Sequence, residues 1–143
     1  MFTRILLVSA AAVALTVSAS GAQAKPLFPF LFNLCNFAHR TQCAANLAKG
    51  NDNTALINQD QWWPGLQFGL QIQNGDGNYA DTEQSGSNQF AFTEQHGNHN
   101  TAYTSQSGYN QASVTVQSGS QGGMWAATSS AGDNTLTVVV QHN

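Results

Sequence analysis

Few residues of this sequence are spaced for catalysis or for metal binding. His96 and His99 are three positions apart and could contact a metal, but two ligands make a weak site and a solvated turn is the simpler interpretation. Residues 75–80 fit the Gly-x-Gly-x-x-Ala pattern of dinucleotide-binding turns, yet no helix is expected to follow them. Glu83 and Glu94 imply no shared pocket, and no serine lies in a nucleophile elbow. We therefore expect no enzyme, no metal site and no cofactor.

The chemistry that does repeat along the chain is hydrogen bonding by side-chain amides. A glutamine recurs every 11 residues, a glycine follows each one two positions later, and a threonine precedes the last four by two positions. Such registered columns predict a chain that coils on itself and stacks similar layers. The columns are Gln73, Gln84, Gln95, Gln106 and Gln117; Gly75, Gly86, Gly97, Gly108 and Gly119; and Thr82, Thr93, Thr104 and Thr115.

The elements that would position these columns are strands of about seven residues, because alternate residues repeat and glycine-containing turns separate the segments. Two strands make a unit of about 22 residues, and four units are expected at 53–73, 78–95, 100–117 and 122–141. The first unit carries an insertion at 62–65. In the last unit, Thr128 replaces a glutamine, and Gln141 lies two residues after the position that the period predicts. The prediction is an all-β fold, a β-solenoid of about four strand-turn-strand repeats that becomes cross-β amyloid on assembly.

Side chains that share parity with the glutamines are expected to point inward and to stack on their copies in the next layer, about 4.8 Å away. Such stacking satisfies amides whose burial without a partner would cost about 1–3 kcal/mol each. The expected stacking ladder comprises Asn53, Gln59, Gln73, Asn78, Gln84, Gln95, Asn100, Gln106, Gln117 and Gln141.

The outward positions predict two unlike faces. Strands in the first half of each unit show mixed residues, whereas those in the second half form an apolar outer face interrupted by Glu94. That face comprises Phe68, Leu70, Ile72, Phe90, Phe92, Val114, Val116, Leu136, Val138 and Val140. Monomers rarely expose such a patch, so we expect a second filament or residues 28–32 to cover it. Unpaired strand edges at 54–59 and 136–141 carry neither charge nor proline and would permit head-to-tail polymerisation.

The region before the repeats differs in kind. Residues 1–24 have a short basic start, an apolar run and an Ala-Gln-Ala cleavage pattern, which predict a secretory signal peptide. Residues 25–52 form an apolar segment with two cysteines, in which 36–49 are expected to form a short helix that stops at Gly50. Cys35 and Cys43 are interpreted either as a disulfide, which export permits, or as two unpaired small apolar residues.

Charge is scarce along the whole chain. Four Lys and Arg residues stand against seven Asp and Glu residues, and no cation occurs after Lys49. A chain so poor in cations lacks the electrostatic surface that nucleic acid requires, so no nucleic-acid partner is expected.

Two stretches, 73–84 and 95–106, match every fixed position of Gln-x-Gly-x-x-Asn-x-Ala-x-x-x-Gln. This pattern resembles the curlin repeat, and the resemblance covers about residues 53–141. It implies a subunit of curli, the extracellular amyloid fibres of bacterial surfaces, which is secreted through an outer-membrane pore and assembles on a nucleator. The apolar segment at 25–52 departs from the Gly- and Asn-rich start of that family.

Two functions remain open at this level. The first is a fibre subunit for adhesion and biofilm matrix, whose partners are other copies of itself, a curli nucleator or major subunit, and the secretion pore. It would be secreted and would form an extracellular fibre on the bacterial cell surface. Its imperfect last unit favours a minor or nucleating subunit. The second is a soluble secreted solenoid that binds ice or polysaccharide, which requires an exposed threonine column and capped ends.

Overall fold

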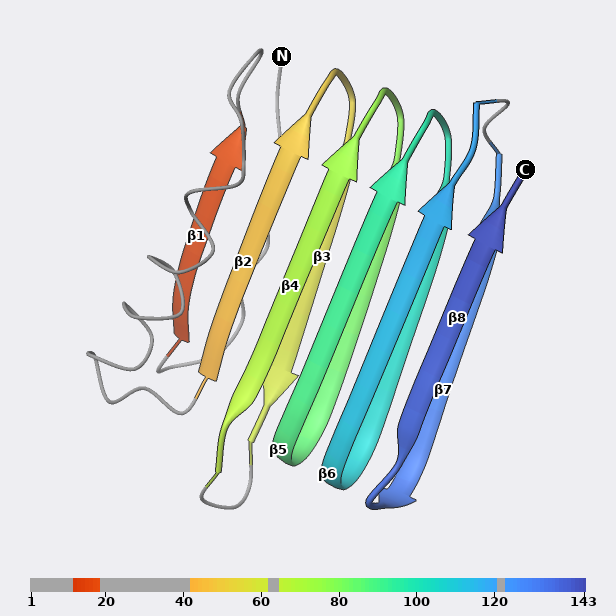
Figure 1. The fold of residues 1–143 in the computed structure, drawn as a ribbon. Helices are drawn as coiled ribbons and strands as arrows, with labels where there is room; N and C mark the ends of the chain where they lie inside the picture. The colour runs from red at the N-terminus through yellow and green to blue at the C-terminus, as the bar shows by residue number, and fades with distance from the viewer. Residues whose placement is uncertain (1–11, 19–41, 62–64, 121–122) are drawn as a thin grey trace.

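The computed structural model describes residues 12–18, 42–61, 65–120 and 123–143, which form eight β-strands (Figure 1). They are β1 (Ala12–Ser18), β2 (Gln42–Lys49), β3 (Thr54–Asp60), β4 (Gln67–Asn74), β5 (Tyr79–His96), β6 (Thr101–Ser118), β7 (Trp125–Asp133) and β8 (Leu136–His142). All pairings between them are parallel. The predicted all-β solenoid of about four turns is confirmed. In this described part of the chain, no helix is long and apolar enough to cross a membrane.

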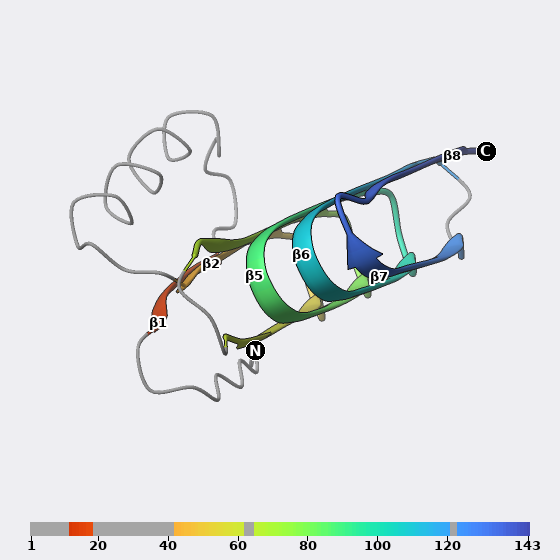
Figure 2. The same cartoon turned by 90° about the horizontal axis from the view of Figure 1, so that it is seen from below.

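The eight strands form one continuous hydrogen-bonded array, which folds at the corners of β5 and β6 into two sheets that face each other across a narrow interior (Figure 2). One sheet, here called the odd sheet, holds β3, the first halves of β5 and β6, and β7. The other, here called the even sheet, holds β1, β2, β4, the second halves of β5 and β6, and β8. Burial alternates along the strands, as it does from Tyr79 to Gln84 in β5, because successive side chains point to opposite faces.

β5 and β6 each turn a corner from the odd sheet to the even sheet without a break. Two short strands were expected at each place, and the structure joins them into single strands of 18 residues. In β5 the corner is made by Gly86, with φ of 130°, and by Asn88, with φ of 53°. A Cβ on Gly86 would overlap the backbone of Gly108 in the next layer, so only glycine lets the layers stack there.

The expected helix at 36–49 is wrong over its described part, because Gln42–Lys49 is strand β2. β2 pairs with β4 from Gln42↔Gln67 to Lys49↔Asn74 and is buried on both faces over most of its length. Pairing and burial against β4 override the helix preference of this Ala-rich segment. The even sheet therefore begins before Asn53, where the repeats were expected to start.

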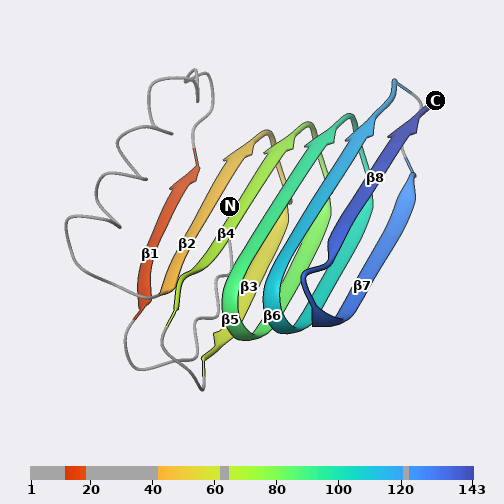
Figure 3. The same cartoon turned by 60° about the horizontal axis from the view of Figure 1, so that its bottom comes forward.

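β1 lies within residues 1–24, the segment predicted to be a signal peptide. It pairs with β2 from Ala12↔Gln42 to Ser18↔Ala48, and with no other strand of the described residues. β1 thus lies at one end of the stack, and β7 and β8 form the other end (Figure 3).

Candidate functional site: stacked amides and an apolar face

The predicted stacking residues divide into three separate ladders, because the 11-residue period alternates between the two sheets. Only residues one full turn apart meet. The ladders are Asn53, Asn78 and Asn100; Gln59, Gln84 and Gln106; and Gln73, Gln95, Gln117 and Gln141.

The asparagine ladder holds the turns that enter the odd sheet. Asn78 accepts through Oδ1 from the backbone N–H of Asn100 at 3.0 Å, and its Nδ2 donates to the carbonyl of Gly97 at 2.8 Å. Asn53 makes the same contacts one layer earlier, with the N–H of Asn78 at 2.9 Å and the carbonyl of Gly75 at 2.7 Å. Each asparagine therefore satisfies one donor and one acceptor of the following turn.

The longest ladder runs at the ends of the even strands. Side-chain amides donate from Gln73 to Gln95 at 3.0 Å, from Gln95 to Gln117 at 2.9 Å, and from Gln117 to Gln141 at 2.9 Å. Each also donates across the interior to a backbone carbonyl of the odd sheet, as Gln95 does to Tyr79 at 3.0 Å. One side chain thus ties together two layers and two sheets.

The third ladder ends the strands of the odd sheet. Gln59 donates to Gln84 at 2.8 Å, and Gln84 donates to Gln106 at 2.9 Å. It stops at Gln106 because the next residue in register is Ser130. The expectation that Thr128 replaces a glutamine is therefore wrong. Thr128 pairs with Thr104, since the chain enters the last layer two residues later than a period of 22 would place it.

A fourth ladder was missed in the sequence. It starts the even strands, with amide contacts of 3.1 Å from Gln42 to Gln67, from Gln67 to Gln89 and from Gln89 to Gln111. The spacing of 22 residues from Gln67 to Gln89, and again from Gln89 to Gln111, is the sequence signal that could reveal it. Gln42 was hidden because its segment was expected to be helical.

The amide ladders have a direction. In every rung, Nε2 of the earlier glutamine donates to Oε1 of the later one. In the ladders that begin at Gln59 and at Gln73, the first oxygen therefore receives no bond from an earlier rung. Gln59 Oε1 and Gln73 Oε1 are buried and have no hydrogen-bond partner. At the other end, Met124, Ser130 and Thr135 occupy three of the four ladder positions, and Gln141 alone keeps an amide. The two ends of the stack are therefore chemically different.

The turn glycines lie where neighbouring layers approach most closely. A Cβ on Gly75 would overlap the carbonyl oxygen of Gly97, and a Cβ on Gly97 would overlap that of Gly119. Gly86 and Gly108 make the corresponding approaches at the opposite corner. Gly119 has an ordinary φ, and a Cβ there would meet the side chain of Asn143.

The apolar outer face is covered at one end only. Phe68 and Leu70 are 4% and 1% exposed and pack with Cys43, Ala45 and Leu47 into a buried cluster. Farther along the stack Ile72, Phe92, Val114 and Val116 are half-buried and Phe90 is exposed. In the last strand Leu136, Val138 and Val140 are 70%, 57% and 70% exposed.

Cys43 lies in the covered part of this face and is disulfide-bonded. The chain's other cysteine, Cys35, lies outside the described residues. Residues 28–32, which were expected to cover the apolar face, also lie outside them.

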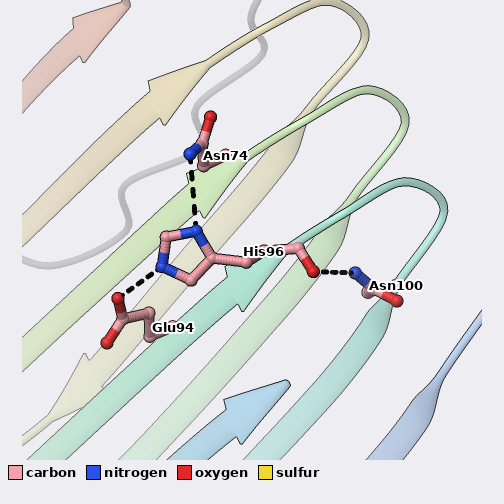
Figure 4. A network of polar contacts seen from close by, with 4 residues as sticks. All are labelled: Asn74, Glu94, His96 and Asn100. Carbon is pink, nitrogen blue, oxygen red and sulfur yellow. Dashed lines mark hydrogen bonds and ion pairs between the residues drawn. The ribbon is translucent and has the colours of Figure 1, made fainter. Parts of the chain in front are cut away.

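The two histidines are not joined in one site. His96 Nε2 lies 2.6 Å from Glu94 Oε1, and Asn74 Nδ2 lies 3.4 Å from His96 Nδ1 (Figure 4). A tautomer with the proton on Nε2 satisfies both contacts. His99 instead packs over Gly77 of the neighbouring layer. Within the described ranges, no group of three or more His, Cys, Asp or Glu residues is placed to hold a metal ion.

The outer face of the odd sheet carries a row of aromatic rings. Ring centroids are 5.5 Å apart for Tyr79 and Tyr103, and 6.5 Å apart for Tyr103 and Trp125. Asp81 accepts a hydrogen bond from the Tyr79 hydroxyl at 3.3 Å. Burial raises the pKa of Asp81 and outweighs this hydrogen bond, which lowers it. Burial, together with the nearby Asp81 charge, raises the pKa of Tyr79.

Comparison with known proteins places a family motif on this framework. The model of the curlin associated repeat matches residues 75–108, from the turn before β5 to the corner of β6. No curated protein and no solved structure matches the chain. The matched stretch contains the ladder residues Gln84, Gln95 and Gln106, and the amide bond from Gln84 to Gln106 lies wholly within it. The chain thus carries a curlin associated repeat at residues 75–108, as its resemblance to the curlin family predicted.

Proposed function

We propose that this protein is a structural subunit of extracellular, curli-like amyloid fibres that serve cell adhesion and biofilm matrix. The observation that supports this most is the Gln73–Gln95–Gln117–Gln141 ladder, which crosses four layers in a single register. Parallel strands with stacked identical amides have the geometry of a cross-β assembly, and a longer stack satisfies more amides per chain.

The ends of the stack favour continuation into another copy. Among the described strands, β3 pairs on one edge only, with β5, and β7 and β8 each pair on one edge only, with β6. The outer edges of β7 and β8 carry no lysine or proline, which soluble proteins use to block such edges. An end contact between unlike surfaces does not close on itself and therefore produces a filament.

Export and partners are part of this proposal. Residues 1–24 would be removed, and the chain would leave through an outer-membrane pore and reach the cell surface. Other copies of the chain and a curli nucleator or major subunit would be its partners, and neither catalysis nor nucleic-acid binding would be involved. The loss of three amides from the last layer favours a minor or nucleating subunit over a major one.

A polysaccharide-binding solenoid is the second candidate. The exposed rings of Tyr103 and Trp125 could stack on sugar rings, as aromatic side chains in carbohydrate sites do. Ice binding has less support, because the threonine column, Thr82, Thr93, Thr104 and Thr115, is buried.

Quiescent incubation of the processed protein, followed by thioflavin fluorescence and then fibre diffraction, tests the proposal. A rise after a lag, with reflections near 4.7 and about 10 Å, is the expected result. A clear solution of monomers that remains β-rich would refute the fibre function and favour the binding module.

A further inference from the structure

The outer edge of β2 accepts a parallel strand. In the structure that strand is β1, which pairs with β2 over seven consecutive positions. β1 belongs to the segment predicted to be cleaved on export, so the processed chain would leave this edge empty. Because β1 pairs with β2 alone among the described strands, its loss leaves the other pairings of the stack in place.

The last strand of the stack matches the vacant place. β8 is seven residues long, as β1 is, and its outer edge has no strand beside it among the described residues. The pairings Cys43↔Phe68, Phe68↔Phe90, Phe90↔Ala112 and Ala112↔Leu136 put Cys43 and Leu136 in the same column. A β8 strand that continued this register on β2 would therefore place Leu136 beside Cys43.

The same register joins apolar residues along the rest of the contact. Val138 would lie beside Ala45, and Val140 beside Leu47. Cys43, Ala45 and Leu47 are the buried row of the apolar cluster, whereas the three β8 residues are more than half exposed. Strands on both sides leave Val114 and Val116 half-buried, so such a contact would remove part of the β8 apolar surface from water, at about 25 cal/mol per Å².

We infer that, in the assembled fibre, β8 of one copy pairs in parallel with β2 of the next and occupies the place that β1 holds in the full chain. This inference rests on the proposed fibre function and specifies the contact through which it is carried out. The signal segment then has a second role, because β1 blocks the docking edge until it is removed.

An alternative contact between copies would pair β7 of one copy with β3 of the next, and β8 with β4. This arrangement is here called flush stacking. The place beside β4 is already occupied by β2, which pairs with β4 over eight positions and has six consecutive buried residues. Flush stacking would have to remove β2 from the sheet, whereas docking on β2 leaves every described pairing of β2 to β8 intact.

Mixed-label fibres test the contact without any mutation. Fibres are grown from equal amounts of ¹³C-labelled and ¹⁵N-labelled processed chain (residues 25–143), so that every short ¹⁵N–¹³C contact is intermolecular. Contacts between Val138 and Ala45, and between Val140 and Leu47, are expected. Fibres whose contacts instead join β7 to β3 and β8 to β4 overturn the inference and leave the fibre function standing. If no fibre or oligomer forms at all, the fibre function fails together with it.

Seeded elongation provides a second measurement. Val138→Lys with Val140→Lys should slow elongation at least about tenfold, because the contact would lose two apolar side chains and would place two ammonium groups beside the buried Ala45 and Leu47. The matched control is Ser129→Lys with Ala131→Lys, on exposed positions of β7 in the same layer, and its rate should stay within about twofold of the parent. Equal rates for the two variants would overturn the contact.

The full chain of residues 1–143 tests the role of β1 itself. Its free β8 can add to a processed seed, but its own β2 is occupied, so it should terminate seeds rather than extend them. Full chain that extends seeds as fast as processed chain does would refute the blocking role.

Discussion

Replacing one buried ladder residue should lower the free energy of unfolding, and the size of the loss can be worked out from the contacts of that residue. Gln95 is 0% exposed and makes three side-chain hydrogen bonds. It accepts from Gln73 at 3.0 Å and donates to Gln117 at 2.9 Å and to the Tyr79 carbonyl at 3.0 Å. Gln95→Ala removes all three contacts and leaves the oxygen of Gln117 buried without this donor.

The expected loss follows from these contacts. A buried acceptor left without a donor costs about 1–3 kcal/mol, and the empty volume of the truncated side chain adds about 1–2 kcal/mol. Together they predict that Gln95→Ala lowers the free energy of unfolding by about 2–5 kcal/mol, a large part of the 5–15 kcal/mol that is typical of a domain.

Urea unfolding of the soluble protein, followed by circular dichroism, measures this loss. The matched control is Asn58→Ala, which removes an exposed amide from β3 and should change stability by no more than about 0.5 kcal/mol. If the two variants unfold at the same urea concentration, the ladder does not stabilise the fold and the reasoning is refuted.

Gln95→Glu adds a pH signature to the same position. An ionised carboxylate would face two acceptors, the Gln117 oxygen and the Tyr79 carbonyl. Burial raises the pKa of such a group, so the variant should be most stable at low pH and should lose stability as pH rises through that pKa. A urea midpoint with the same pH dependence in the variant and the parent would contradict this expectation.

Three further changes probe steric fit and charge. Gly75→Ala should lower the melting temperature far more than Gly132→Ala, because φ is positive at both but only at Gly75 would a Cβ overlap the next layer. Gly69→Ala should destabilise the fold because its Cβ would lie 2.9 Å from Ile57 Cγ2. Ile57→Ala removes that Cγ2 atom, so Gly69→Ala should cost less stability in the Ile57→Ala background than in the parent; an equal cost in both backgrounds would show that this contact is not the cause. Because the pKa of Asp81 is raised in the folded protein, its stabilising contribution is full below the ordinary pKa of 3.8 and is lost as pH rises through the folded-state pKa. Asp81→Asn should therefore remove this loss of stability from a series of urea midpoints measured across that pH range.

The repeat columns were enough to predict most of the solenoid. Alternation from Asn78 to Gln84 predicts which side chains face inward, and those residues are indeed buried. The period failed at both ends of the stack. The local composition of Gln42–Lys49 favours a helix, and only pairing with β4 makes it a strand. Thr128 was misaligned because the last turn is longer than the others, and strand register rather than sequence spacing decides which residues stack.

The sequence by itself determined the fold class, the inward amides and the turn glycines, because each depends on a local period that every layer repeats. Tertiary structure alone decided which amides meet, since an 11-residue column divides between two sheets and only residues one full turn apart come within hydrogen-bonding distance. It also decided that the two ends of the stack differ. The Oε1 atoms of Gln59 and Gln73 are buried without a hydrogen-bond donor, whereas β8, at the other end, exposes apolar side chains. The physical reason is that a ladder's direction, and what lies beside its first and last rungs, exist only once the layers are stacked.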